Sequence, residues 1–202
     1  MRKIGIIFAA IAISMVMSVS SDADEKDSTS VSKPSVQAAK KPKYQLRKKP
    51  TTISDEDALK VFKLKIDEND RRIPLEYIQN EFQDNGDDTI TDHATGLMWR
   101  KSRYPDHLSY ERARAYIDDL NRYKFAGFND WRLPTLDELT SLLTPEKQSN
   151  GLYINPIFDY KYNSYWTSDQ RSSGGAWGVS FGYGFVTWSN VRYCARAVRS
   201  LQ

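Results

Sequence analysis

The chain has 202 residues, enough for one folded domain with extensions. Its 29 Lys and Arg nearly balance 26 Asp and Glu, and this small excess does not favour nucleic-acid binding. A single cysteine, Cys194, excludes an intrachain disulfide and a cysteine-cluster metal site.

Residues 1–20 have the pattern of an export signal. Arg2 and Lys3 come first, and the uncharged, mostly apolar run from Ile4 to Val19 ends among small residues. This run is a little short for a bilayer span, which needs about 20 residues, so we expect a cleaved signal rather than an uncleaved anchor. The mature protein is therefore predicted to be periplasmic or secreted.

Residues 21–51 are predicted to form a disordered, charged linker. The stretch SSDADEKDSTS is acidic and serine-rich, whereas the segment from Lys33 to Pro50 is basic and contains no acidic residue. Such a composition cannot bury enough apolar surface to fold alone. We interpret the segment as a solvated tether, and weak attraction to anionic envelope lipid or polysaccharide is the alternative.

Residues 52–80 are predicted to form a helical extension beside the main domain. Ser54 can cap a helix whose first turn is acidic, which suits the helix dipole. Leu59, Phe62 and Ile66 recur at helical spacing and predict its buried face.

The main domain is predicted to span residues 81–202 and to begin with short strands. The turn signal DNGD at residues 84–87 precedes the β-branched stretch TIT, and ATG turns the chain again before LMW. The carboxylates between Asp84 and Asp92 could bind calcium, which prefers oxygen ligands. Their spacing differs from the EF-hand loop, and aspartate also favours turns, so we favour a structural turn.

Two helices are predicted next in the chain. Ser109 can cap the first, in LSYERARAYIDDLNRY, where the apolar stripe is Ala113, Tyr116, Ile117 and Leu120. In the stretch GFNDWRLPTLDEL, Thr135 and Glu138 have the spacing of a capping box, and Pro134 marks the boundary before it. The helix buries Leu136, Leu139, Leu142 and Leu143.

The stretch before this second helix is predicted to be a structural motif. We expect Trp131 and Arg132 to lock the loop against the sheet, with Arg132 paired to a carboxylate. The members of the motif are Asn129, Asp130, Trp131, Arg132, Pro134, Thr135 and Glu138.

The carboxyl-terminal third is predicted to be rich in strands. The stretches SYWTSD, AWGVSF, FVTWSN and RYCARAV alternate with glycine-marked turns. Trp177, Val179 and Phe181 share one face by alternation. The predicted fold class is α+β, with two main helices packed on a twisted antiparallel sheet.

The sequence offers little for catalysis, and we expect no enzyme, cofactor or metal. GVSFG matches the G-x-S-x-G pattern, but Ser180 lies within an alternating strand, and both His93 and His107 come earlier in the chain. Two histidines and one cysteine do not form a zinc ligand set. Cys194 is better interpreted as a structural residue than as a nucleophile.

Aromatic residues near turns are the candidate binding surface. Most large aromatics are buried, but those beside polar residues at turns suit sugar rings or protein surfaces. The candidate ligand-binding residues are Trp166, Asp169, Arg171, Tyr183, Trp188 and Asn190.

Five motifs together resemble the Lcl C-terminal domain family, named after a bacterial collagen-like adhesin. They are EFQDNGDDTITDHATGLMWRKS, FAGFNDWRLPTLDELTSLL, YWTSD, AWGVSFGYG and CARAVRS, between about Phe82 and Ser200. The resemblance implies a C-type-lectin-like fold, similar to the formylglycine-generating enzyme group, with a loop-rich ligand face. Relatives tend to have glycine where this chain has Asp88.

The resemblance also implies a role, because the named adhesin binds sulfated polysaccharide. We therefore expect an exported, adhesin-like, non-catalytic module that binds glycan or sulfated polysaccharide of the envelope. The alternative is a structural or protein-interaction module with an envelope protein as partner. A membrane would be contacted only through an uncleaved signal or the basic linker.

Overall fold

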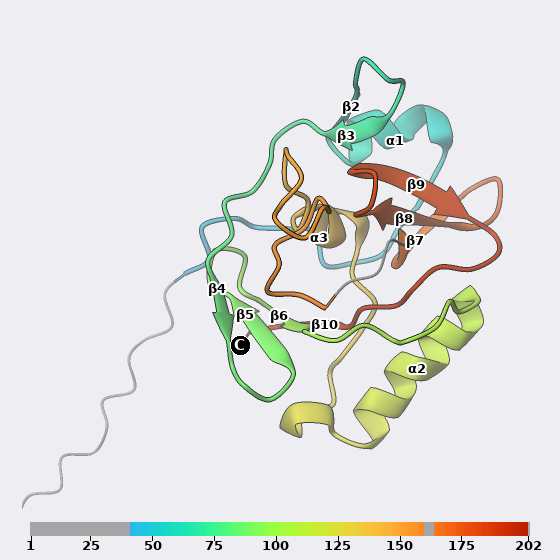
Figure 1. Ribbon diagram of the computed structural model, residues 1–202. Coiled ribbons are helices and arrows are strands. Elements are labelled where there is room, and N and C mark those ends of the chain that lie inside the picture. Colours follow the sequence, from blue (N-terminus) through green and yellow to red (C-terminus); the bar gives the residue numbers. More distant parts are fainter. Residues whose placement is uncertain (1–40, 160–163, 202) are drawn as a thin grey trace, which may run out of the picture. The chain divides into compact units, whose positions relative to one another are not determined.

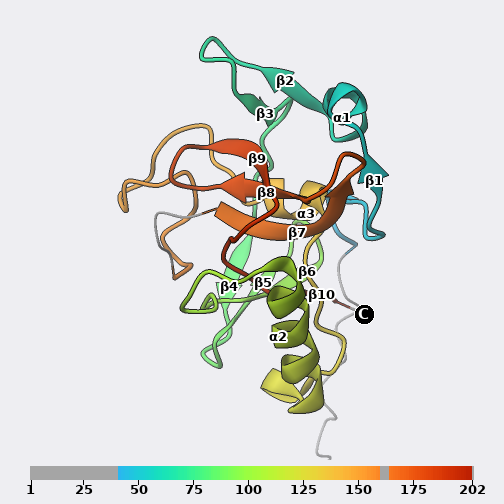
Figure 2. The same ribbon diagram turned by 90° about the vertical axis from the view of Figure 1, so that its right-hand side faces the viewer.

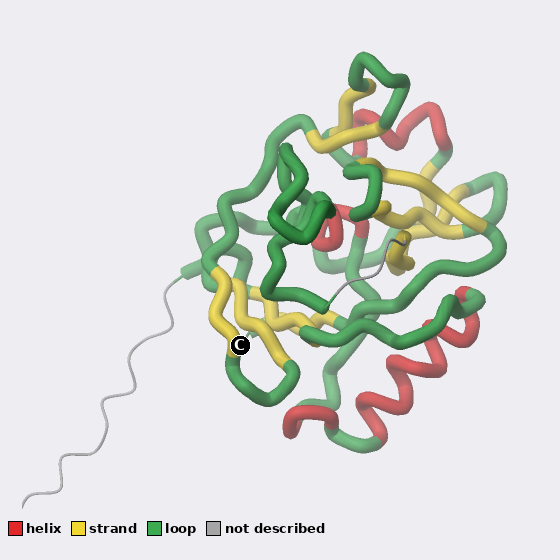
Figure 3. Tube along the Cα trace, viewed as in Figure 1, coloured by secondary structure: helices red, strands yellow, loops and turns green. Residues whose placement is uncertain are grey.

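The computed structural model describes residues 41–159 and 164–201, all within one compact unit. Helices and strands are joined by long loops, and the chain is a mixed α+β protein, as the sequence predicts (Figures 1 and 3). The expected signal at residues 1–20 and most of the expected linker lie outside the described residues. Within the described ranges, no helix is long and apolar enough to cross a membrane.

The strands form two sheets rather than the single sheet predicted from the sequence. The larger sheet has the order β1-β7-β8-β9-β3-β2, with β1 parallel to β7 and the other neighbours antiparallel. Its strands are β1 (Thr52–Ile53), β2 (Leu64–Ile66), β3 (Arg72–Pro74), β7 (Ser164–Arg171), β8 (Ala176–Ser180) and β9 (Phe185–Ser189).

The smaller sheet is antiparallel, with the order β10-β6-β5-β4. Its strands are β4 (Phe82–Asp84), β5 (Thr89–Asp92), β6 (Leu97–Arg100) and β10 (Val198–Ser200). The predicted last strand, RYCARAV, is mostly irregular. Tyr193 and Cys194 form only isolated bridges, and the chain then leaves the larger sheet to pair with β6.

Of the helices, only α2 (Tyr110–Arg122) is long. It is capped by Ser109, and its predicted apolar stripe is buried. The second expected helix, α3 (Leu136–Thr140), has five residues, and a short 3₁₀ turn, η1 (Phe125–Gly127), follows α2. The predicted leucine face of α3 is nonetheless buried, including the two leucines beyond its end.

The capping box at the start of α3 is confirmed. Thr135 accepts a hydrogen bond from the backbone of Glu138, and Glu138 accepts one from the backbone of Thr135 at 2.9 Å. Arg132 donates to both carboxylate oxygens of Glu138, at 2.6 and 2.7 Å, as the expected pairing with a carboxylate requires. Trp131 is buried, so the motif closes this loop against the domain.

Residues 52–80 are not a helical extension. The helix α1 (Asp55–Val61) is short and ends where Lys63 adopts a left-handed φ of +51°, so Ile66 falls in β2 and not on a helix face. The segment then forms β3, which pairs with β9. The hairpin of β2 with β3, which β9 extends, thus overrides the helical spacing, and β1, β2 and β3 are part of the larger sheet.

The end of the expected linker, residues 41–51, also packs on the domain. Arg47 donates to both carboxylate oxygens of Asp169, at 2.8 and 2.7 Å, and to Asp137 at 2.9 Å. The Thr135 hydroxyl donates to the Arg47 carbonyl oxygen at 2.7 Å. We call residues 41–51 the strap, because the ion pairs of Arg47 and the packing of Leu46 against the core hold this segment on the domain.

The larger sheet separates two apolar clusters. Strand alternation places Trp177 on one face, in the cluster with residues of α1 and α3, and Trp166 on the other, in the cluster with residues of α2. Figure 2 shows α1 above and α2 below the strands β7, β8 and β9. Position 178 in β8 requires glycine, because a Cβ there would lie 2.5 Å from the Tyr165 carbonyl oxygen on the neighbouring strand.

The DNGD turn between β4 and β5 is confirmed, and its geometry explains Asp88. This residue has a φ of +65°, which glycine adopts without strain and aspartate tolerates. Its carboxylate accepts from the backbone and hydroxyl of Ser102 and from Arg100. The hydrogen bonds of the Asp88 carboxylate to Arg100 and Ser102 therefore offset the strain of its left-handed backbone conformation.

Candidate functional site

The structure does not bring the six candidate ligand-binding residues together. Trp166 is 1% exposed, and its indole N–H donates to the Leu108 carbonyl oxygen at 2.8 Å. Asp169 is completely buried and accepts hydrogen bonds from Arg47, the Thr51 backbone and the Leu136 backbone. Asp169 therefore anchors the strap and the start of α3, and its oxygens are already occupied.

Arg171 and Trp188 form one contact pair. The guanidinium lies 3.6 Å from the centre of the Trp188 ring and also pairs with Asp55 at the start of α1. Hydrogen bonding from Arg171 lowers the pKa of Asp55. Trp188 remains 41% exposed, but Arg171 is mostly buried, and its guanidinium is occupied by Asp55 and the Trp188 ring.

Tyr183 and Asn190 lie beyond opposite ends of β9. Tyr183, 62% exposed, is in the turn between β8 and β9, beside Phe185. Asn190 is exposed and follows the other end of the strand. Only Asn190 shares a pocket with another candidate, namely Trp166.

That pocket, the sheet-end pocket, has a volume of about 240 Å³. It lies where the start of α2 meets the ends of β7, β8 and β9. Its wall includes Tyr110 and Trp166, whose rings make an edge contact with centroids 5.5 Å apart. The planar polar side chains of Glu111, Gln170 and Asn190 also line it, and all three residues are exposed.

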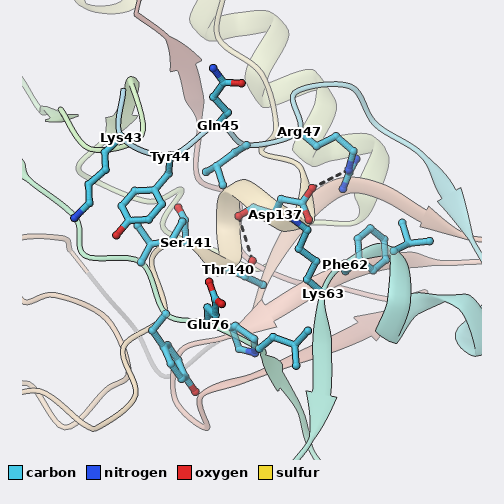
Figure 4. A pocket seen from close by; sticks show the side chains of 16 residues that line it. Lys43, Tyr44, Gln45, Arg47, Phe62, Lys63, Glu76, Asp137, Thr140 and Ser141 are labelled. Atoms are coloured by element: carbon cyan, nitrogen blue, oxygen red, sulfur yellow. Dashed lines mark hydrogen bonds and ion pairs between the residues drawn. The ribbon is translucent and has the colours of Figure 1, made fainter. Parts of the chain in front are cut away.

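A larger groove, of about 710 Å³, runs between the strap and the segment after β3. We call it the strap groove. Figure 4 shows Tyr44 and Gln45 of the strap on one side, Glu76 on the opposite side, and Asp137 of α3 between them. Lys63 also lines it.

Asp137 is a carboxyl group of the strap groove with a shifted pKa. Burial raises the pKa of its carboxyl above the ordinary value, and the nearby Asp169 raises it further, while Arg47 opposes the shift. A raised pKa in a groove is one mark of functional sites, but ion-pair networks also produce it. Because Arg47 joins both carboxylates, we assign Asp137 to the anchor of the strap.

The acidic turn shows no arrangement that favours calcium. Asp84 pairs with Lys101 at 2.6 Å, Asp87 accepts from Thr89, and the buried Asp92 accepts from Asn80, Glu81, Ala94 and Thr95. In the described part of the chain, no group of three or more His, Cys, Asp or Glu side chains could hold a metal ion. These carboxylates serve the turn and its neighbours.

Neither candidate nucleophile is accessible. Ser180 is buried within β8, as its alternation predicts, and a turn and β9 follow instead of a helix. Cys194 is completely buried in the core. The neighbouring Arg196 is also completely buried and donates to the carbonyl oxygens of Arg100, Lys101 and Asp159.

The sequence did not indicate the strap groove. Its strap wall has a basic composition typical of linkers, and the opposite wall lies within the segment predicted to be a helical extension. One available signal was the pair Tyr44 and Leu46, two apolar residues within an otherwise basic run. Alternating apolar residues of this kind suit a segment that lies on a folded surface.

Comparison with known proteins identifies a family. No curated protein and no solved structure matches the chain significantly. The family model described as the Lcl C-terminal domain matches residues 88–201, which is more than half of the 202 residues. It covers most of the smaller sheet, α2, α3 and the strands β7, β8 and β9. The chain therefore belongs to the Lcl C-terminal domain family.

Proposed function

We propose that this protein is an exported, non-catalytic module that binds a sugar ring of an envelope or extracellular glycan in the sheet-end pocket. One observation carries the proposal: two aromatic residues and three planar polar side chains line the same small pocket. Its volume is below the roughly 300–1,000 Å³ of clefts for drug-sized ligands, so it suits one ring.

The chemistry of the lining matches that of a sugar. Hydroxyl groups donate and accept hydrogen bonds, and the Gln170 and Asn190 amides do both, while the Glu111 carboxylate accepts. Tyr110, which packs on the buried Trp166, supplies apolar surface for the ring's C–H groups. Hydrogen bonding to Ser109 and to the backbone lowers the pKa of Glu111, so its carboxylate is ionised at neutral pH.

The charge of the sheet-end pocket favours uncharged over sulfated sugars. Among the described residues, Glu111 is the only charged side chain that lines this pocket. A sulfated ring would place a second negative charge beside it, so we expect uncharged rings to bind more tightly than sulfated ones. Sulfated polysaccharide is therefore the less favoured form of the glycan proposal.

Two parts of the proposal come from the sequence and the family. Export follows from the signal pattern at residues 1–20. A C-type-lectin-like arrangement and an adhesin-like role follow from the resemblance to the family. The mixed α+β fold is compatible with that arrangement.

A glycan array and NMR titration with methyl glycosides test the proposal. Binding of an uncharged glycan should weaken about tenfold or more in Asn190→Ala and Gln170→Ala, because each removes hydrogen bonds of about 0.5–1.5 kcal/mol and leaves ligand groups unpaired. Tyr123→Ala is the matched control, since Tyr123 is an exposed aromatic residue at the other end of α2.

Folded protein that binds neither uncharged nor sulfated glycans would overturn this function and leave the structural or protein-interaction alternative. Binding of sulfated chains alone, unaffected by both variants, would place the glycan site elsewhere.

A further inference from the structure

We infer that the strap groove is a docking site for an extended segment of another protein, in which apolar and acidic side chains alternate. This site is separate from the sheet-end pocket, because the two share no lining residue.

Aliphatic side chains make much of the groove surface. Val61 is 39% exposed and Leu75 is 52% exposed, and both line the groove together with the partly buried Leu46 and Ile78. Exposed aliphatic residues gathered in one groove are typical of protein interaction sites. The aromatic residues Tyr44 and Tyr77 also line the groove, so the preference for a peptide over a sugar rests on the backbone groups of the walls.

The charges of the groove favour an acidic partner. Arg47 pairs with Asp137 and with the buried Asp169, and the other charged side chains that line the groove are Lys43, Lys63 and Glu76. Both lysines are exposed, and among the described residues neither takes part in an ion pair. An acidic side chain on either flank of a bound segment therefore meets a lysine that makes no ion pair.

The two walls of the groove offer backbone groups. Residues 45–46 of the strap and 76–79 after β3 lie outside helices and strands. Their backbones make no hydrogen bonds to one another or to other described residues. Unpaired backbone groups beside apolar surface are what an added strand uses, since main-chain bonds provide affinity and alternate side chains provide specificity.

The occupant is therefore a peptide rather than a glycan. A sugar chain lacks the regular N–H and C=O groups that would pair with both walls. The groove volume of about 710 Å³ lies within the range of clefts that bury a substantial ligand.

Fluorescence anisotropy with a labelled peptide of alternating valine and glutamate tests the inference. Two matched probes separate the contribution of charge from that of main-chain hydrogen bonds. A valine–lysine peptide reverses the charge, and an N-methylated valine–glutamate peptide cannot donate main-chain hydrogen bonds. We expect saturable binding of the first peptide and at least about tenfold weaker binding of each of the other two.

Variants connect this binding to the groove. Lys43→Glu and Lys63→Glu should each weaken it about fivefold, as expected for exposed charge pairs, and Leu75→Asp about tenfold or more. Lys147→Glu is the control, because Lys147 is exposed and does not line the groove. No saturable binding up to millimolar protein, or equal binding of the N-methylated peptide, overturns the inference.

A sulfated oligosaccharide serves as the competing ligand. Its binding to the groove, lost in Lys43→Glu and Lys63→Glu while the peptide does not bind, would show a glycan site and contradict the inference. Loss of glycan binding in Asn190→Ala with intact peptide binding would show that the two sites are independent.

Discussion

Replacing Arg47 with methionine should destabilise the fold by about 3 kcal/mol. The substitution keeps a long apolar side chain but removes three charge-assisted hydrogen bonds, two to Asp169 and one to Asp137. Asp169 is completely buried and would retain only two backbone donors. Breaking a buried ion pair costs about 3–5 kcal/mol, and we take the lower end because the Arg47 side chain is 26% exposed.

Urea denaturation followed by tryptophan fluorescence measures this loss. In a chain of this size, about 3 kcal/mol corresponds to a fall in melting temperature of roughly 6–12 °C. Asp169→Asn in the Arg47→Met background should restore part of the stability, because it removes the uncompensated buried charge.

The control is Arg122→Ala, whose partner Asp119 lies on the exposed surface of α2. That pair should contribute less than about 0.5 kcal/mol. If Arg47→Met is no more destabilising than Arg122→Ala, the strap does not belong to the folded domain and the linker interpretation is correct for residues 41–51.

Two further predictions concern the motif before α3. Glu138→Gln should destabilise the protein by about 2–3 kcal/mol, because the buried carboxylate accepts from Arg132 and from the cap of α3; a loss below about 0.5 kcal/mol in chemical denaturation would contradict this role. Asp130→Asn should cost about 1 kcal/mol at pH 7, since Asp130 is half exposed but pairs with the buried Arg199. Hydrogen bonding from Arg199 lowers the pKa of Asp130, so this pair stabilises the fold above the ordinary aspartate pKa of about 3.9 and loses its effect as the pH falls through the lowered value. Thermal unfolding from pH 7 to pH 2 should therefore bring the two proteins together at the acidic end, and a constant difference would refute the ion pair.

Local sequence patterns predicted much of the framework. The capping box of Thr135 and Glu138, the apolar stripe of α2 and the turn at residues 84–87 depend on neighbours a few positions apart, and all three are confirmed. The same is true of Ser180, whose alternation placed it in a strand. The family motifs, too, are local stretches, and the family they indicated is confirmed.

Predictions that depended on strand pairing and on packing between elements were less successful. Ile66 has helical spacing from Leu59 and Phe62, yet the pairing of β2 with β3 and of β3 with β9 makes it part of a strand. The candidate residues Trp166 and Trp188 look alike in sequence. Strand register places them on opposite faces of one sheet, and the packing of α2 buries the first.

The sequence by itself determined the mixed α+β class, the family and the start of the main helix, because the patterns that indicate them are local stretches of the chain. Only the tertiary structure decided where the surface lies and which charges are buried. Arg47 finds its carboxylates 90 and 122 positions along the chain. No local pattern encodes such a contact, so a segment with the composition of a linker became one wall of the strap groove.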